Sequence, residues 1–157
     1  APALETVDLN EATREVLALV FSDLLRNRVV LRVELDDDHP LRVTGDRVQL
    51  QQVILNLVRN ASDAMSDVSD RPRQLVVRLD AAEAGSACLS VQDTGVGLGP
   101  QGAERLFDAF YTTKSAGMGI GLFVSRSIVE RHEGRLWAEP NDGPGATFSF
   151  SIPIRTG

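Results

Sequence analysis

The sequence predicts a two-layer α/β sandwich in which helices cover one face of a mixed, mostly antiparallel sheet. Two observations predict this class. Apolar residues recur at helical spacing in long segments, and short alternating segments between them are joined by tight turns rather than long crossovers. With 157 residues, 43% of them apolar and 24% charged, the chain suits one globular domain over residues 1–157.

The first half of the chain begins with a helix. Apolar residues from Leu9 to Leu25 recur every three or four positions, and Val29 to Leu35 then alternate like a strand. Three aspartates before Pro40 suit neither element, so they predict a turn. Asp46 is a good N-cap for a long helix to about residue 65, because its side chain can accept hydrogen bonds from the amides of the first turn.

Glycines and turn residues mark the elements that follow. Residues 74–79 and 87–92 alternate like strands on either side of Gly85-Ser86, which predicts a hairpin. A helix from about Gly119 to Arg131 follows a glycine-rich segment, and a turn rich in proline and glycine at residues 140–145 joins the last two strands. The other expected elements are short strands at residues 41–44, 135–138 and 146–152 and a short helix at residues 103–110.

The composition excludes several classes of protein. The single cysteine, Cys88, leaves no internal disulfide and no multi-cysteine zinc site. No stretch reaches the roughly 18 to 20 apolar residues of a membrane span, and the first residues lack signal-peptide features. The net charge of -6 includes no basic stripe for nucleic acid. We expect a cytoplasmic domain without a nucleic-acid partner, an expectation that leaves open a membrane anchor elsewhere in the parent protein.

The long helix carries the first pattern that points to chemistry. One apolar stripe predicts its core side, and it consists of Leu50, Val53, Ile54, Leu57, Val58, Ala61, Ala64 and Met65. Gln49, Asn56, Asn60 and Asp63 border this stripe. Asparagine is disfavoured inside helices, so Asn56 and Asn60 indicate either amides bonded within the protein or a ligand site. An amide oxygen is a hard donor that suits Mg²⁺.

A second pattern, Asp93-Thr94-Gly95-Val96-Gly97, closes a predicted strand with an acid and two glycines. Glycine lets a ligand approach the backbone closely beside the carboxylate. A carboxylate accepts but cannot donate, so it suits the exocyclic amine of adenine. Such a bond, worth about 1.5 to 3 kcal/mol, favours adenine by roughly 10- to 150-fold over a base without that donor. The same five residues are also typical of an ordinary turn.

The third pattern is Gly117-Met118-Gly119-Ile120-Gly121-Leu122, which leads into a predicted helix whose N-terminal amides favour an anion. Its spacing fits neither a Rossmann fingerprint nor a Walker loop. Lys114, the only lysine, lies three residues upstream and can reach a terminal phosphate as a point charge, or it is simply a solvated surface lysine. Together, the three patterns would bind three parts of one ligand: its metal ion, its base and its phosphates.

These segments resemble the ATP-binding catalytic domain of bacterial two-component sensor histidine kinases, within the GHKL superfamily of gyrase, chaperone and mismatch-repair ATPases. The resemblance spans nearly the whole chain and implies a Bergerat-type fold that binds ATP and Mg²⁺. The matching segments are the N box at Asn56–Ala61, the glycine boxes at Asp93–Gly97 and Gly117–Leu122, the F box at Phe107–Phe110 and the closing glycine-threonine strand at Gly145–Phe148.

The resemblance implies a role for each matching residue. Asn60 would be the Mg²⁺ ligand and Asp93 the adenine acceptor, assisted by Thr147 through water. Gly95 and Gly97 would form the pocket floor. The phosphate loop would comprise Gly117, Met118, Gly119, Ile120, Gly121 and Leu122, with Phe107 and Phe110 anchoring an ATP lid whose Lys114 meets the γ-phosphate.

Two residues depart from the family pattern. Asp63 stands at an ATP-binding position where some members carry a phosphate-facing lysine. Glu133 replaces a common glycine, which we expect to move the helix cap to Gly134.

Asn56 separates kinases from ATPases within this superfamily. Chaperone and gyrase ATPases place a glutamate here as the general base, and an amide cannot take a proton. The resemblance therefore implies a kinase in which Asn56 and Lys114 assist transfer of the γ-phosphoryl group to a histidine. Two alternatives stay open: a serine kinase of the anti-sigma type and a nucleotide-sensing module without catalysis.

Neither histidine of this chain suits the role of phosphoacceptor. His39 lies in an acidic turn and His132 near a helix end, where we expect a capping or packing role. The acceptor is expected on a separate dimerisation hairpin before Ala1, with a response regulator downstream. The isolated domain should be monomeric, bind ATP and not label itself.

Overall fold

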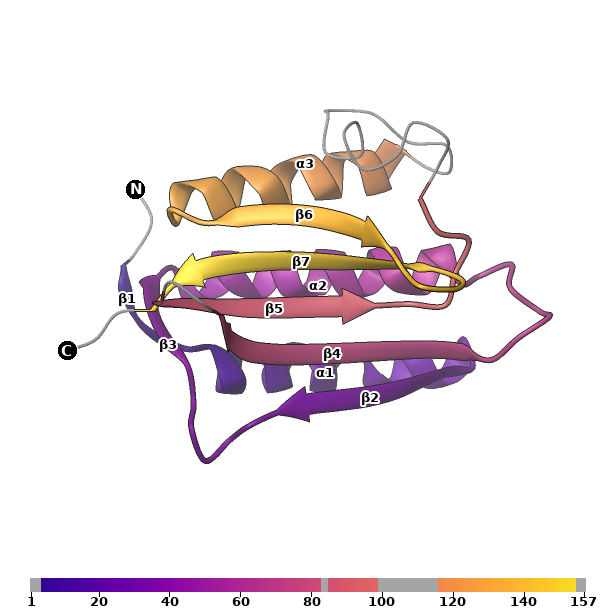
Figure 1. The fold of residues 1–157 in the computed structure, drawn as a ribbon, viewed down its shortest axis with the longest axis horizontal. Helices are drawn as coiled ribbons and strands as arrows, with labels where there is room; N and C mark the ends of the chain where they lie inside the picture. The colour runs from indigo at the N-terminus through magenta and orange to yellow at the C-terminus, as the bar shows by residue number, and fades with distance from the viewer. Residues whose placement is uncertain (1–3, 83–84, 99–115, 155–157) are drawn as a thin grey trace.

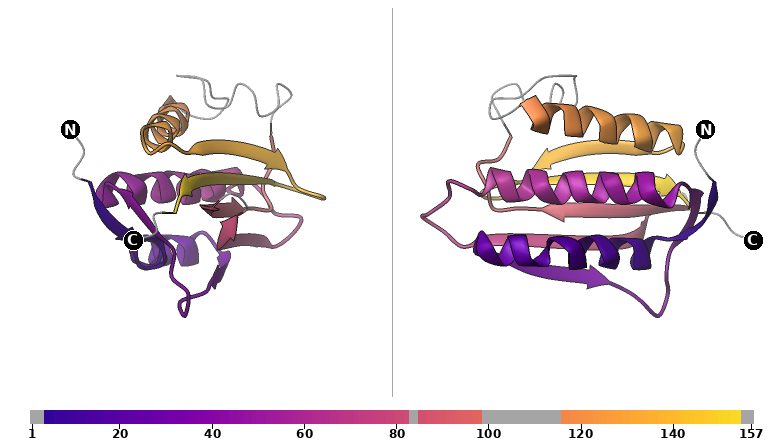
Figure 2. Two further views of the ribbon diagram at one scale, coloured as in Figure 1. Left: turned by 60° about the vertical axis from the view of Figure 1, so that its left-hand side comes forward. Right: turned by 180° about the vertical axis from the view of Figure 1, so that it is seen from behind.

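The computed structural model describes residues 4–82, 85–98 and 116–154. Their elements follow in the order β1 (Glu5–Asp8), α1 (Leu9–Arg26), β2 (Val29–Leu35), β3 (Arg42–Gly45), α2 (Arg47–Ala64), β4 (Arg73–Ala82), β5 (Ser86–Gln92), α3 (Ala116–Arg131), β6 (Arg135–Pro140) and β7 (Ala146–Pro153). Helices α1, α2 and α3 lie on one side of the main sheet (Figures 1 and 2). The predicted two-layer arrangement is confirmed.

The main sheet has five strands in the order β2-β4-β5-β7-β6. Only the β2–β4 pair is parallel, and the other three pairs are antiparallel. The predicted mixed, mostly antiparallel sheet is therefore confirmed, including the hairpin of β4 and β5. The sequence did not predict β1, which pairs with β3 in a separate two-stranded sheet, because four residues with one buried apolar side chain give no period to detect.

Alternation decides which side chains of the sheet face the helices. In β5, Ala87, Leu89 and Val91 are buried, while the residues between them are more exposed. Phe148, Phe150 and Ile152 of β7 are also buried, and they belong to one hydrophobic cluster with the apolar stripe of α2 except Ala64. On the other face of the sheet, Arg78 donates to Glu34 over 2.7 Å and lowers the pKa of that carboxyl.

The helix caps show how the sequence sets the helix limits. Asp8 caps α1 by accepting from the amide of Glu11, and Asp46 caps α2 by accepting from the amide of Gln49, each over 3.1 Å. The predicted cap at Asp46 is confirmed. Helix α3 begins at Ala116, three residues before its predicted start, so the glycines at 117 and 119 are helical. Glycine is unfavourable in helices, so local propensity gives little sign that the helix extends back to include Gly117.

His132 ties the end of α3 to the beginning of α2. Its Nδ1 donates to the Ile128 carbonyl over 2.7 Å, and its Nε2 accepts from the Asp46 amide over 3.0 Å. A carbonyl only accepts and an amide only donates, so this arrangement needs the neutral ring protonated on Nδ1. The packing role predicted for His132 is confirmed, and Gly45 leaves room for its ring, because a Cβ there would lie 2.8 Å from Nε2.

The C-terminal cap of α3 differs from the prediction. Glu133 itself adopts the left-handed conformation, with φ 62°, and the Gly134 amide donates to the Val129 carbonyl over 2.9 Å. Gly134 is needed for a different reason: a Cβ there would collide with the carbonyl oxygen of Ser151 on β7. None of the helices in the described ranges is long and apolar enough to cross a membrane.

Gly134→Ala should destabilise the fold by about 1 to 3 kcal/mol, because Ser151 on β7 cannot move away without disturbing the hydrogen bonds of β7 to β5 and β6. We expect the melting temperature to fall by several degrees. Gly85→Ala is the matched control, since Gly85 has φ +72° but no atom within 4 Å of its added Cβ. It should cost only the left-handed backbone penalty of about 1 kcal/mol. Equal losses in thermal denaturation would contradict the steric explanation.

Candidate functional site

Asp93 follows β5 and is almost completely buried, with 1% of its surface exposed. Its Oδ1 accepts from the Gly95 amide over 2.8 Å and from the Ala146 amide over 3.4 Å. By alternation with Ala87, Leu89 and Val91, its side chain faces the helical layer. A buried carboxylate is costly unless hydrogen bonds compensate it, and these two main-chain donors do so for Oδ1.

Gly95 brings the Asp93 segment against the end of α2. A Cβ on Gly95 would collide with the carbonyl oxygen of Ala64 and lie 2.8 Å from the Ala64 Cβ, and the Val96 amide donates to that carbonyl over 3.0 Å. The sequence suggested that Gly95 makes room for a ligand; in the structure it makes room for a helix. Gly97 has φ +79°, a conformation that favours glycine. Because Gly95 and Val96 contact Ala64, the Asp93 segment lies one helical turn beyond Asn60 on α2.

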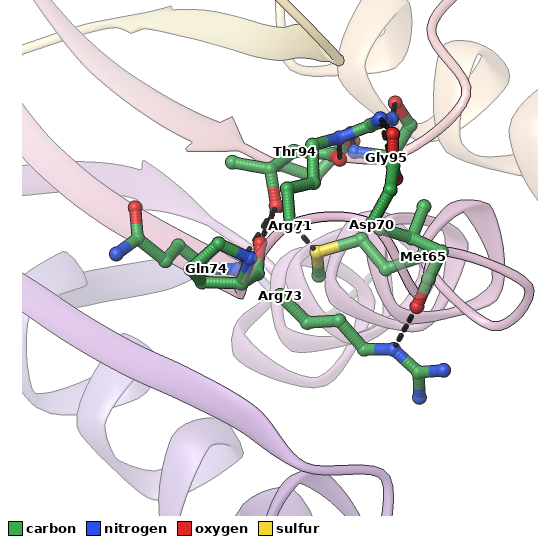
Figure 3. A network of polar contacts seen from close by, with 10 residues as sticks. Met65, Asp70, Arg71, Arg73, Gln74, Thr94 and Gly95 are labelled. Atoms are coloured by element: carbon green, nitrogen blue, oxygen red, sulfur yellow. Dashed lines mark hydrogen bonds and ion pairs between the residues drawn. The ribbon is translucent and has the colours of Figure 1, made fainter.

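Figure 3 shows a second anchor of this segment, on the loop between α2 and β4. Arg71 donates from Nε to the Thr94 carbonyl over 2.8 Å and from Nη2 to the Gly95 carbonyl over 2.7 Å. The Thr94 hydroxyl donates to the Pro72 carbonyl over 2.8 Å and accepts from the Gln74 amide over 3.0 Å. The sequence prediction missed Arg71, because its partners are main-chain oxygens distant in sequence.

Thr147 is not on the same side of the sheet as the Asp93 carboxylate. It pairs with Gln92 in the β5–β7 register, and it alternates with the buried residues Ala146 and Phe148. Its hydroxyl donates to Asn141 Oδ1 over 2.6 Å. The residue of β7 that does contact the carboxylate is Ala146, through its amide. A main-chain donor leaves no mark on the sequence, so this contact could not be predicted.

The two asparagines of α2 have different surroundings. Asn56 donates from Nδ2 to the Gly121 carbonyl over 3.3 Å and to the Ser125 hydroxyl over 3.1 Å, so it links α2 to α3. Asn60 is 8% exposed, yet its side chain makes no hydrogen bond within the part of the chain that the structure describes. Of the two predicted alternatives, bonding within the protein applies to Asn56, while for Asn60 the ligand site stays a prediction.

Asn60 also fits the requirements of Mg²⁺. Within the described ranges, no group of three histidine, cysteine, aspartate or glutamate side chains could hold a metal. A single amide oxygen suits a cation that takes most of its ligands from water and phosphate. Asp63, in contrast, is exposed and lines a cavity of about 380 Å³ between α1 and α2, together with Asp23 and Arg26.

The N-terminal end of α3 lies at the same end of the molecule as the C-terminal ends of α2 and β5 (Figure 1). The first amides of a helix have no partner within it and favour an anion. The backbone of residues 117–121 belongs to this first part of α3, and Leu122 is buried. Lys114, Phe107 and Phe110 lie outside the described residues, as do the side chains of Met118 and Ile120.

Residues 45–156 match the family model described as "Histidine kinase-, DNA gyrase B-, and HSP90-like ATPase". The chain belongs to this family. It is 44% identical over 145 residues to the sensor protein FixL of Bradyrhizobium diazoefficiens, covering 92% of this chain and 28% of FixL. It is 37% identical to the sensor histidine kinase TmoS of Ectopseudomonas mendocina, covering 98% of this chain and 16% of TmoS. The chain thus spans less than a third of these relatives.

Solved structures give the same assignment of the fold. The nucleotide-free catalytic domain of histidine kinase ThkA superposes with a TM-score of 0.84 at 29% identity, covering 97% of this chain and 98% of that one. Full-length ShkA in complex with AMPPNP superposes with a TM-score of 0.85 at 25% identity, covering 100% of this chain and 32% of ShkA. The Bergerat-type fold implied by the sequence resemblance is confirmed.

The different surroundings of Asn56 and Asn60 predict different effects on stability. Asn56→Ala removes two hydrogen bonds between α2 and α3 and should cost about 1 to 2 kcal/mol of unfolding free energy. Asn60→Ala removes none and replaces asparagine by a better helix former, so we expect a change below about 0.5 kcal/mol. Urea denaturation of both variants measures the difference. Similar losses in the two variants would show that Asn60 has a structural role.

Proposed function

We propose that the chain is one ATP-binding catalytic domain that binds Mg-ATP and donates the γ-phosphoryl group to a histidine on a separate dimerisation domain. The observation that carries this proposal is the arrangement of three unlike groups at one end of the molecule. These groups are the buried acceptor Asp93, the amide of Asn60, which makes no side-chain hydrogen bond among the described residues, and the amino end of α3. They suit, in that order, the 6-amino group of adenine, a phosphate-bound cation and the phosphates.

Each group has a distinct task in this proposal. Asp93 accepts from the 6-amino group while Gly95 and Ala146 hold its carboxylate. Asn60 would hold Mg²⁺, which neutralises the charge that develops on the phosphates when it is bound. The amides at the start of α3 and Lys114 serve the phosphates. The residues from Gly117 to Leu122 supply that part of the site.

Phosphoryl transfer requires positioning and charge neutralisation more than covalent help from the protein. An imidazole nitrogen forms the new bond to the γ-phosphorus, the bond to the bridging oxygen breaks, and ADP leaves with that electron pair. Asn56 supports transfer to histidine over hydrolysis, because its amide cannot take a proton from water and already donates to α3. Its catalytic contribution is to hold α3 beside α2.

The partners follow from the chemistry and from the relatives. ThkA, which superposes with a TM-score of 0.80 at 29% identity, has been solved in complex with the response regulator TrrA. We infer a response regulator for this chain as well, which takes the phosphoryl group from the histidine. ATP and such regulators are cytoplasmic, so the domain should act there, as a monomer when isolated and without nucleic acid.

Nucleotide titrations test the binding proposal. Asp93→Asn should weaken ATP binding by roughly 10- to 150-fold, because the amide nitrogen can face the 6-amino group and the charged acceptor is lost. Asn60→Ala should remove the dependence of ATP affinity on Mg²⁺. Isothermal titration calorimetry with and without Mg²⁺ measures both effects. The exposed residues Asp38 and Gln52 give the controls Asp38→Asn and Gln52→Ala, which should bind as the wild type does. Unchanged ATP affinity in Asp93→Asn would refute the adenine assignment.

A reconstituted phosphotransfer assay tests the kinase proposal. The domain, mixed with a histidine-bearing dimerisation hairpin from a sensor kinase and γ-labelled ATP, should yield acid-labile, base-stable phosphohistidine on the hairpin. The domain alone should not become labelled. Label on serine would favour the anti-sigma type of kinase, and ATP binding without any label would favour a nucleotide-sensing module. Either result would overturn transfer to histidine.

A further inference from the structure

Three consecutive carbonyl oxygens of the Asp93 segment each accept a hydrogen bond from a side chain of another element. The Asp93 carbonyl accepts from Asn141 Nδ2 over 2.7 Å. The Thr94 carbonyl accepts from Arg71 Nε over 2.8 Å and the Gly95 carbonyl from Arg71 Nη2 over 2.7 Å. Arg71 comes from the loop before β4, and Asn141 from the turn between β6 and β7. Two side chains therefore hold this segment from two directions.

The Thr94–Gly95 peptide connects Arg71 to the acid. In a trans peptide the carbonyl and the amide hydrogen point in opposite directions. Arg71 holds the Thr94 carbonyl, so the Gly95 amide on the other side of the same peptide points to Asp93 Oδ1, 2.8 Å away. If this peptide turned, the carboxylate would lose a main-chain donor.

The orientation of Asn141 is decided by its partners. Its Nδ2 donates to two carbonyl oxygens, those of Asp93 over 2.7 Å and Pro144 over 3.0 Å. Carbonyl oxygens only accept, so the amide nitrogen must face them and the amide oxygen must face Thr147. The Thr147 hydroxyl donates to that oxygen over 2.6 Å. Thr147 therefore acts on the far side of the sheet, where it holds Asn141 in place.

Neighbouring contacts strengthen both anchors. Asp70 pairs with Arg71 Nη1 over 3.0 Å. Gly145 has φ +92°, and a Cβ there would collide with the Asp93 carbonyl oxygen, so the β6–β7 turn closes directly onto the segment. Arginine can make two parallel hydrogen bonds from one rigid plane, and lysine cannot.

We propose that Arg71 and Asn141 are positioning residues that determine how strongly Asp93 recognises a 6-amino purine. They act on the base through the orientation of the Asp93 segment and touch no part of the nucleotide. This inference rests on the proposed function, in which Asp93 accepts from adenine.

The test compares two nucleotides that differ only in the group Asp93 recognises: ATP and purine riboside 5′-triphosphate, which lacks the 6-amino group. Equilibrium affinities are measured for the wild type, Arg71→Met, Arg71→Lys and Asn141→Ala. Each variant should lose ATP affinity by at least about threefold, up to the roughly 10- to 150-fold expected for complete loss of the bond. The affinity for purine riboside 5′-triphosphate should change less than twofold.

A role confined to folding would lower both affinities by the same factor, and that result would overturn the inference. Arg78→Met is the matched control, since it removes an arginine bonded to Glu34 on the other face of the sheet and should leave both affinities unchanged. If Arg71→Met does not fold, Arg71→Lys and Asn141→Ala supply the same comparison. A wild type that binds both nucleotides equally would refute the proposed function instead.

A measurement without nucleotide gives an independent readout. Amide hydrogen exchange at Gly95 should accelerate in Arg71→Lys and stay unchanged in Arg78→Met. Of the two arginines, Arg71 bonds to the Thr94–Gly95 peptide, whereas Arg78 bonds to Glu34. Unchanged Gly95 exchange in Arg71→Lys would also overturn the inference.

Discussion

The buried carboxylate of Asp93, with main-chain amides as its donors, is the constraint on which the rest of the site depends. An acid with 1% exposure is stable only where donors replace water. Gly95 and Ala146 supply them, and these residues belong to two different parts of the chain. The turn after β5 and the start of β7 must therefore meet at the carboxylate before it can serve a ligand.

The helical layer is joined to this centre at several points. Gly95 packs against the Ala64 carbonyl at the end of α2, which relates the acid to Asn60 on the same helix. Asn56 then joins α2 to α3, and His132 joins the other end of α3 to the start of α2. The three groups proposed to bind base, metal and phosphates are thus held by one connected set of hydrogen bonds and close contacts. A change in any link should alter the site from a distance.

Much of the fold could be predicted because its signals are local. The cap at Asp46, the apolar stripe of α2 and the alternation in β5 each follow from a period or a side chain within a few residues. The start of α3 was placed three residues too late, because glycine has a low helix propensity and gives little local sign of a helix start. We expected the cap of α3 to move to Gly134, yet Glu133 itself takes the left-handed conformation.

Sequence by itself determined which residue types occur and at what spacing: an acid after a strand, two asparagines one turn apart and a glycine-rich helix start. Tertiary structure alone decided their tasks. Asn56 and Asn60 look alike in sequence, and only the position of α3 makes Asn56 a link between helices, while Asn60 makes no side-chain hydrogen bond in the ranges that the structure describes. Thr147 resembles a ligand residue, but strand alternation turns it to the opposite face. The physical reason is that main-chain donors, carbonyl acceptors and sheet faces carry no side-chain signature, so long-range contacts assign them.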